Sequence, residues 1–454
     1  MKKWFKYARL RPFDVSTELG RSDERYRLAF WSVAASLFSK SLALLVMLFS
    51  VSWTLPYLGA ERFGVWMTIA SFASMLIFLD LGIGNALTNH VAEAAATADP
   101  GALAQRISGG LGLMFVVAVL ASLLLSVLVV LLPWARIIKV QDALIHSEIK
   151  DTLLLFAILF GVNLFSNGVH RVFAGLQRSF ETQLATAIGS MLSILTLSWA
   201  AASQAGVATL LLATLGWQSL SSLILLYLLI KRRLFRLRGI GAAIRTGKAP
   251  LLKTGGLFFV LQIGTMVGWG ADSLIISSTL GAAQVAVFSI AQRLFQFVTI
   301  PLAITNAPLW AAYADAHALG DKGYIRRTLN RSLLLTGGAA VVGSGLLLFV
   351  GSDLIRQWTS DTLVVPFALI LAMAVWTFCE TTGNSFAMMM NGCGIVKPQV
   401  MAVSLFLLLA IPLKILAVQI GLPWLITATI ISYVLAVPVY YSILFKMGKF
   451  EVFK

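Results

Sequence analysis

Long apolar runs, each about 20 residues and separated by short polar stretches, recur along the whole chain. A run of that length is what an α-helix needs to cross the hydrocarbon core of a bilayer. The pattern predicts an all-α polytopic membrane protein with twelve transmembrane helices. Their ranges are 28–55, 63–90, 107–133, 151–172, 182–204, 206–230, 254–279, 282–308, 332–351, 365–391, 399–420 and 423–445.

Two pairs of segments repeat each other across the two halves of the chain. Residues 58–66 align with residues 280–288 at an offset of 222 positions, around a shared Leu-Gly-Ala turn. Asn167 and Gly175 align with Asn384 and Gly392 at an offset of 217. Two similar offsets far apart in the chain predict a duplicated unit, here a parallel repeat of six helices and six helices.

A basic connection near the middle of the chain divides the two predicted lobes. The expected organisation has two lobes, a linker and two cytoplasmic ends, at 1–27, 28–230, 231–253, 254–446 and 447–454. The cleft between the lobes is the expected route of transport. The N-terminal segment is too long and too charged for a cleavable leader.

Composition agrees with the apolar pattern. Of the 454 residues, 59% are hydrophobic and 12% are charged, and the mean hydropathy is +0.87. The net charge of +16 is distributed unevenly between the two sides of the membrane. The N-terminal segment and every second connecting segment after it hold 27 Lys and Arg, counting Arg171 at the end of a span, and the segments on the other side hold 5. The positive-inside rule then places both termini in the cytoplasm, and the charge favours membrane lipids over nucleic acid. The two cysteines, both beside a late helix, do not indicate a disulfide scaffold.

Enzyme machinery is missing from the sequence. The four histidines do not cluster, and no phosphate-binding Gly-rich loop with Lys-Ser or Lys-Thr occurs. We therefore expect neither a hydrolase nor an ATP-driven pump, and neither a cofactor nor a metal.

Charged residues within spans carry the chemistry, because they are costly in hydrocarbon. Arg293 lies near the middle of its span with Gln292 and Gln296 at helical spacing. Its guanidinium suits an anion such as a phosphate, and a helix-locking ion pair is the alternative. Lys40 lies near the middle of the first span beside Ser36, which is typical of a cavity wall or of a structural pair.

A third cation and three acids also lie within spans. Lys414 is near the outer end of its span and could snorkel outward or bind substrate. Asp80, beside a glycine pair, favours a structural role, whereas Asp272 and Glu380 are balanced between structure and binding of a proton or sodium ion. Each acid could instead neutralise a buried cation. Two amides share helices with Asp272 and Glu380 and extend the polar wall, Gln262 and Asn384.

Residues 59–89, GAERFGVWMTIASFASMLIFLDLGIGNALTN, resemble the first helical pair of Wzx-type polysaccharide flippases. Residues 288–293 and 308–313 resemble the eighth span of the same family, which belongs to the multidrug/oligosaccharidyl-lipid/polysaccharide exporter superfamily. The resemblance implies two lobes in a V around a cationic cavity. It also implies that a monomer in the bacterial inner membrane moves an undecaprenyl-diphosphate-linked O-antigen or exopolysaccharide unit outward by alternating access. Its expected partners are the polysaccharide polymerase and the chain-length regulator.

In this scheme Arg293, Lys40 and Lys414 bind the diphosphate, and the polar wall contacts the glycan. A proton or sodium gradient drives the cycle through Glu380, Asp272 or Asp80. The main alternative is a cation-coupled multidrug antiporter of the same superfamily, for which an excess of acids is expected. Away from their first and last residues, the spans hold three bases and three acids, and the bases lie nearer the centre, which favours the flippase. A membrane scaffold without transport is a third alternative.

Overall fold

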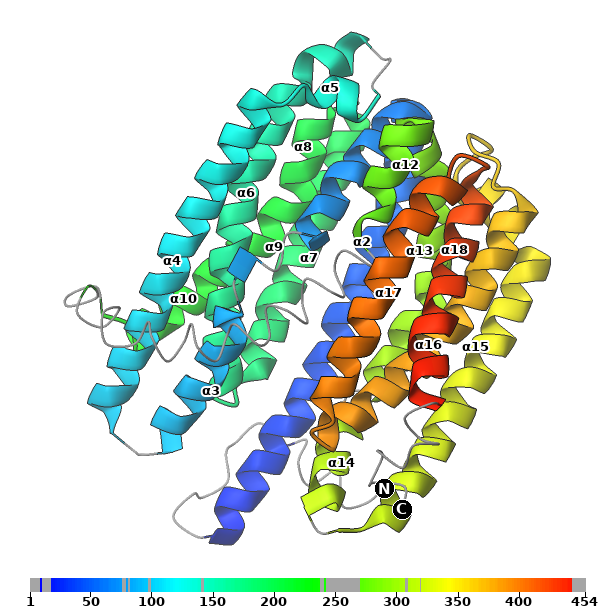
Figure 1. The fold of residues 1–454 in the computed structure, drawn as a ribbon. Coiled ribbons are helices and arrows are strands. Elements are labelled where there is room, and N and C mark those ends of the chain that lie inside the picture. Colours follow the sequence, from blue (N-terminus) through cyan, green and yellow to red (C-terminus); the bar gives the residue numbers. More distant parts are fainter. Residues whose placement is uncertain are drawn as a thin grey trace. The chain divides into compact units, whose positions relative to one another are not determined.

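A computed structural model shows a helical membrane protein (Figure 1). It describes residues 9, 18–75, 79–80, 82–96, 99–139, 143–236, 241, 270–306, 309–318 and 320–442. Within these ranges, nine helices are long and apolar enough to cross a membrane. The chain is therefore a multi-pass membrane protein, as predicted.

The chain divides into two compact units. The first holds residues 1–53, 76–133 and 148–259, and the second holds residues 54–75, 134–147 and 260–454. The described helices of the first unit, in chain order, begin with part of α2 (Glu18–Met75) and continue with α3 (Ile83–Ala96), α4 (Pro100–Leu131), α6 (Ala143–Gly175), α7 (Ser179–Ala202), α8 (Val207–Leu211), the π-helix η3 (Leu212–Gly216), α9 (Trp217–Leu220) and α10 (Ser222–Lys231).

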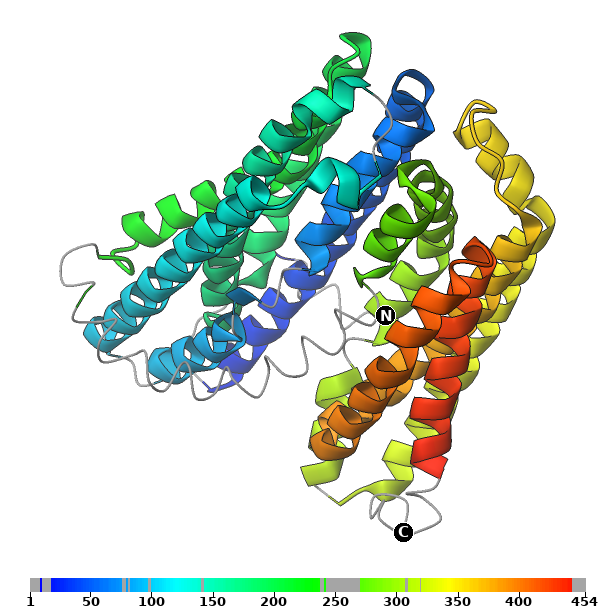
Figure 2. The same cartoon turned by 45° about the horizontal axis from the view of Figure 1, so that its top comes forward.

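The second unit contains the later part of α2 and a further set of helices. In chain order they are α5 (Trp134–Ile137), α12 (Asp272–Leu280), α13 (Ala282–Asn306), α14 (Leu309–Ala318), α15 (Lys322–Trp358), α16 (Phe367–Gly392), α17 (Val396–Ala417), α18 (Leu422–Val434) and the π-helix η4 (Leu435–Val439). Helices α15 and α16 lie side by side and make the most extensive helix pair of the unit (Figure 2).

The break between the first two predicted spans agrees with the structure, whereas the end of the second span differs from it. The range Glu18–Met75 of α2 contains two helices, which meet at a kink at Gly59, inside the predicted outer loop at 56–62; φ at Gly59 is 71°. The second span was predicted to reach residue 90, but α2 ends at Met75 and α3 begins at Ile83. The Asp80 carboxylate accepts the Gly82 N–H at 2.8 Å, and Gly82 has a φ of 71°. This local turn breaks the helix, although the apolar pattern runs through it.

The repeat is visible in the backbone. Gly59 and Gly281, 222 positions apart, share an unusual conformation with φ of 71° and 93° and ψ of 174° and 165°. Only glycine adopts this region without strain. The Leu-Gly-Ala turn is thus conformationally the same in both halves.

The ends of helices repeat in the same way. The Arg178 N–H donates to the Phe173 carbonyl at 2.9 Å after α6, and the Ile395 N–H donates to the Met390 carbonyl at 2.8 Å after α16. Both pairs are 217 positions apart, and both close a helix end in the manner of a Schellman motif. These matched helix ends are what a duplicated unit predicts.

Candidate functional site

Arg293 lies on α13 and is half-buried. Its Nη2 donates to the Met67 Sδ of α2 at 3.0 Å. The two helices touch through backbone, because a Cβ added to Gly64 would overlap the Ala282 carbonyl oxygen. Close packing without side chains therefore brings the later half of α2 to the arginine. On the same helix, Gln292 is exposed.

Gln296 lies one turn beyond Gln292 and is half-buried. With Arg293 between them in sequence, the two amides extend the polar surface that the sequence predicted on this helix. An amide can donate and accept, so this stretch offers hydrogen bonds to hydroxyl groups as well as to an anion.

Lys40 lies on the first part of α2, which belongs to the first unit, and is half-buried. Ser36, one turn earlier, is also half-buried, and Ser39 is buried. Lys40 and Arg293 belong to different units, and their joint binding of a diphosphate stays a prediction.

Lys414 and Asp272 form an ion pair, so Asp272 neutralises a buried cation, which was one of the predicted alternatives; the sequence did not predict which cation. The Lys414 Nζ donates to Asp272 Oδ1 at 2.6 Å, and their side chains are only 2% and 8% exposed. The interpretation that Lys414 snorkels outward is wrong, because its side chain points inward from α17 to the first turn of α12. Burying both charges together avoids the large cost of burying either alone.

Asp80 is buried at the turn that precedes α3. Its carboxylate accepts the Gly82 N–H, and a Cβ added to Gly84 would meet Asp80 Oδ2 at 2.9 Å and the Cγ of Arg171 at 3.3 Å. Thr88 also donates to the Arg171 carbonyl oxygen at 3.3 Å. These contacts join the start of α3 to α6, which agrees with the structural interpretation of Asp80.

Glu380 is exposed on α16. One turn away, Gly383 leaves room for the Tyr433 hydroxyl of α18, which a Cβ would overlap. Trp376, one turn before Glu380, packs edge to face on Tyr433 with ring centroids 5.6 Å apart. Helical spacing places Glu380 on the same side of α16 as Trp376 and Gly383, where Glu380 stays exposed beside Tyr433. Gln262, predicted to line the polar wall, lies outside the described residues.

A polar network that the sequence did not predict joins α13, α15 and α16. The buried Asn306 Nδ2 donates to Ser385 Oγ at 2.9 Å and to Asn384 Oδ1 at 3.3 Å, and Ser332 Oγ donates to Asn306 Oδ1 at 3.1 Å. Thr336 Oγ1 lies 3.0 Å from Ser385 Oγ. Asn384 takes part in this helix contact and is half-buried, and its contact with the glycan stays a prediction. The four-residue spacing of Ser332 and Thr336 was the available signal.

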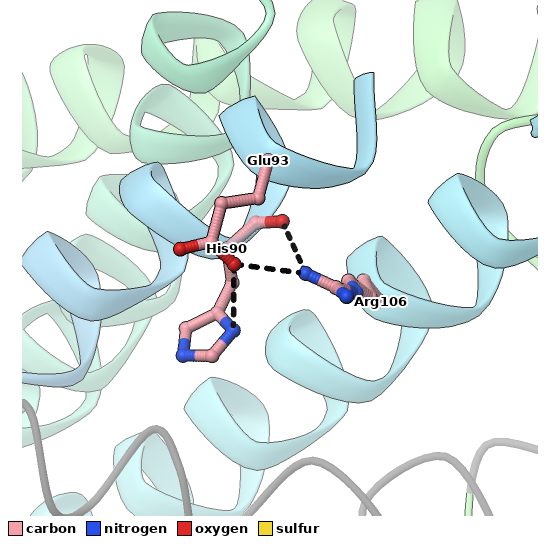
Figure 3. Close-up of polar contacts among 3 residues, drawn as sticks. All are labelled: His90, Glu93 and Arg106. Atoms are coloured by element: carbon pink, nitrogen blue, oxygen red, sulfur yellow. Dashed lines mark hydrogen bonds and ion pairs between the residues drawn. The ribbon is translucent and has the colours of Figure 1, made fainter. Parts of the chain in front are cut away.

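Another polar cluster lies where α3 ends and α4 begins (Figure 3). Arg106 Nη1 donates to the His90 carbonyl oxygen and to Glu93 Oε2, each at 3.2 Å. His90 Nδ1 lies 4.0 Å from the same carboxylate oxygen. Arg106 thereby joins the last turns of α3 to the first turns of α4. Among the described residues, no group of three His, Cys, Asp or Glu side chains could hold a metal ion.

Residues 27–313 match the polysaccharide biosynthesis protein family, and the chain belongs to that family. A protein of Yersinia pseudotuberculosis assigned to O-antigen export is 20% identical over 424 residues, which are 89% of this chain and 93% of that protein. The resemblance to Wzx-type flippases of the exporter superfamily is therefore confirmed. The expectation of a transporter, not an enzyme, agrees with these relatives.

Solved structures share the fold. A multidrug resistance MATE family transporter in its inward-facing conformation superposes with a TM-score of 0.71 at 14% identity, over 90% of this chain and 98% of that chain. A transporter of the same superfamily from Pyrococcus furiosus, described as having a binding pocket of reverse polarity, gives 0.62 at 14% identity, over 94% and 95%. At these identities the likeness concerns the fold alone.

Proposed function

We propose that this flippase moves an undecaprenyl-diphosphate-linked oligosaccharide from the cytoplasmic to the outer leaflet of the bacterial inner membrane. The substrate is an O-antigen or exopolysaccharide repeat unit, and a proton or sodium gradient drives its movement by alternating access. Membership of the polysaccharide biosynthesis family and the relative assigned to O-antigen export support a lipid-linked glycan as the substrate.

Arg293 is the residue that carries this proposal. A diphosphate that leaves water must exchange its hydration for donors in the protein, and a charged guanidinium fork provides two parallel donors. Arg293 is half-buried on α13, and the neighbouring Gln292 is exposed for hydroxyl groups of a sugar. Lys414 is a weaker candidate, since Asp272 already holds its ammonium group.

The proposed cycle starts with the diphosphate on Arg293 and Lys40 while the glycan contacts the amides of α13. The two lobes then rock, and the lipid tail stays in the bilayer. Glu380 is the preferred site for the driving proton or sodium ion, because this residue is exposed on α16. Asp80 and Asp272 are buried, and their carboxylates accept hydrogen bonds from Gly82 and Lys414. The polymerase and the chain-length regulator would act on the delivered unit.

Transport of a fluorescent lipid-linked oligosaccharide in proteoliposomes tests the proposal. Arg293→Ala should lower the translocation rate about 10- to 100-fold, which corresponds to about 1.5–3 kcal/mol for hydrogen bonds to a charged group. The translocation rate of Arg293→Lys should lie between those of the wild type and of Arg293→Ala, because lysine keeps the charge but lacks the two parallel donors of the guanidinium group. Arg356→Ala, an exposed arginine in the last turn of α15, is the matched control. Wild-type rates for Arg293→Ala at equal protein levels would overturn the proposal.

A cation-coupled multidrug antiporter is the second candidate, favoured by the MATE fold and by the exposed Glu380. Loss of drug resistance in cells carrying Glu380→Gln, with unchanged surface glycan, would support it. Loss of surface glycan with unchanged drug sensitivity would instead support the flippase.

A further inference from the structure

One face of α15 carries arginines at its first turns and an uncovered apolar surface beyond them. Arg327 and Arg331 are exposed, and within the described part of the chain neither forms an ion pair. The next turn presents Leu334 and Leu335, which are 76% and 72% exposed. Such exposure in a transmembrane helix marks a surface that faces lipid.

The same face has a shallow groove. At 3.6 residues per turn, Arg327, Arg331, Gly338 and Gly345 fall within about 40° of one another around the helix. A Cβ added to either glycine would meet no atom within 4 Å. Leucines and valines flank this line of glycines, at 334, 335, 341 and 342. From Arg331 to Gly345 the groove is about 21 Å long at 1.5 Å per residue, close to the length of an acyl chain.

The repeat provides an internal comparison, because α4 starts 222 positions before α15 and both have an aspartate N-cap, Asp99 and Asp321. On α4 the positions of the two arginines hold Gln105 and Gly109. The one arginine at the start of α4 is paired with Glu93.

The positions of the two groove glycines also differ between the copies. On α4 they hold Val116 and Leu123, which are 44% and 58% exposed and fill the line that is open on α15. Basic charge and an open groove therefore occur together on one copy only. A shared requirement for spanning the membrane does not explain this difference, since both helices span it.

We propose that this face of α15 is a binding site for an anionic phospholipid. The phosphate of the lipid accepts hydrogen bonds from Arg327 and Arg331, and one acyl chain lies along Gly338 and Gly345 between the apolar ridges. Charge complementarity selects the headgroup, and the surface potential of anionic lipids attracts each basic residue at this depth. With the predicted orientation, the lipid belongs to the cytoplasmic leaflet.

Native mass spectrometry of the full-length protein, titrated with phosphatidylglycerol or phosphatidylcholine, tests the site. R327Q/R331Q should bind phosphatidylglycerol about 25-fold more weakly, at roughly fivefold per arginine. R356Q, at the other end of the same exposed helix, should bind as the wild type does. Gly338→Leu with Gly345→Leu should weaken binding several-fold while the arginines remain, because the side chains occupy the groove.

Thermal unfolding in detergent provides a second measurement, which does not require the bound lipid to stay on the protein in the gas phase. Phosphatidylglycerol should raise the midpoint of the wild type and of R356Q, and should raise it little for R327Q/R331Q. Equal lipid binding by R327Q/R331Q and R356Q would overturn the proposal. The proposal would also be overturned if millimolar inorganic phosphate displaced phosphatidylglycerol, or if the protein bound undecaprenyl phosphate more tightly than phosphatidylglycerol. Cross-linking of a second copy of the chain to this face of α15 would overturn it as well.

Discussion

The pairing of Lys414 with Asp272 changes what each residue can do. An ammonium group held at 2.6 Å by a carboxylate has one donor committed, and both side chains are buried. In a low-dielectric site, breaking the pair from one side leaves an uncompensated charge, which costs about 3–5 kcal/mol. Removing both partners together costs far less. The pair therefore distinguishes a structural from an ion-coupling role for Asp272.

We expect Asp272→Asn alone to lower the yield and thermal stability of the purified protein sharply, and Lys414→Met alone to do the same. The double variant should recover most of the stability, because no buried charge is left unpaired. Transport by the double variant then decides the role. Recovered transport means that the pair only joins α12 to α17, whereas a stable but inactive protein means that Asp272 takes part in coupling. Failure of the double variant to regain stability would contradict the pairing itself.

Helices in this protein are joined in two different ways at equivalent places. At offsets of 222 and 217, Thr336 and Ser385 correspond to Met114 and Gly168. Thr336 and Ser385 share a hydrogen bond at 3.0 Å, whereas a Cβ added to Gly168 would meet the Met114 Cγ at 3.1 Å. One copy packs a methionine on a glycine, and the other uses hydroxyl groups. The two helices therefore touch at the equivalent position in both halves, through an apolar contact in one half and a hydrogen bond in the other.

Asn306 is the centre of the polar version, and its removal should be costly. Asn306→Ala should destabilise the protein by about 1–2 kcal/mol, since interhelical hydrogen bonds in membranes contribute on the order of 0.6 kcal/mol each and Asn306 makes three. The midpoint of thermal unfolding in detergent measures this. Asn330→Ala, an exposed asparagine on α15, is the matched control and should unfold like the wild type. Equal midpoints for both variants would contradict the network.

The helices themselves could be predicted from the sequence, but their partners could not. Apolar length gave most spans to within a few residues, as for α13 at 282–306 against the predicted 282–308. Asp80 hydrogen-bonds only two residues along the chain, so a helix break was locally encoded. Lys414 and Asp272 are 142 positions apart, and nothing in either helix specifies that they meet. Such contacts depend on how helices pack, which periodicity alone does not determine.

At the scale of the whole molecule, the charge distribution predicts which loops face which side of the membrane. Lys139 and Arg356 lie on segments predicted outside, and Arg106 and Arg327 on segments predicted in the cytoplasm. All four are exposed, so a cysteine at any of them should be reachable from its own side. The native cysteines, one half-buried and one buried, are first replaced in Cys379→Ser and Cys393→Ser.

In intact bacterial spheroplasts, a membrane-impermeant maleimide should label Lys139→Cys and Arg356→Cys fully and leave Arg106→Cys and Arg327→Cys unlabelled until the membrane is permeabilised. The physical reason is that Lys and Arg resist translocation and hold their loops in the cytoplasm. Labelling of Arg327→Cys from outside would invert the topology. The lipid bound to α15 would then belong to the outer leaflet. The proposed entry of the substrate from the cytoplasmic side would be contradicted. The four positions sample both units, so a mixed result would show that the two halves do not share one orientation, which a parallel repeat forbids.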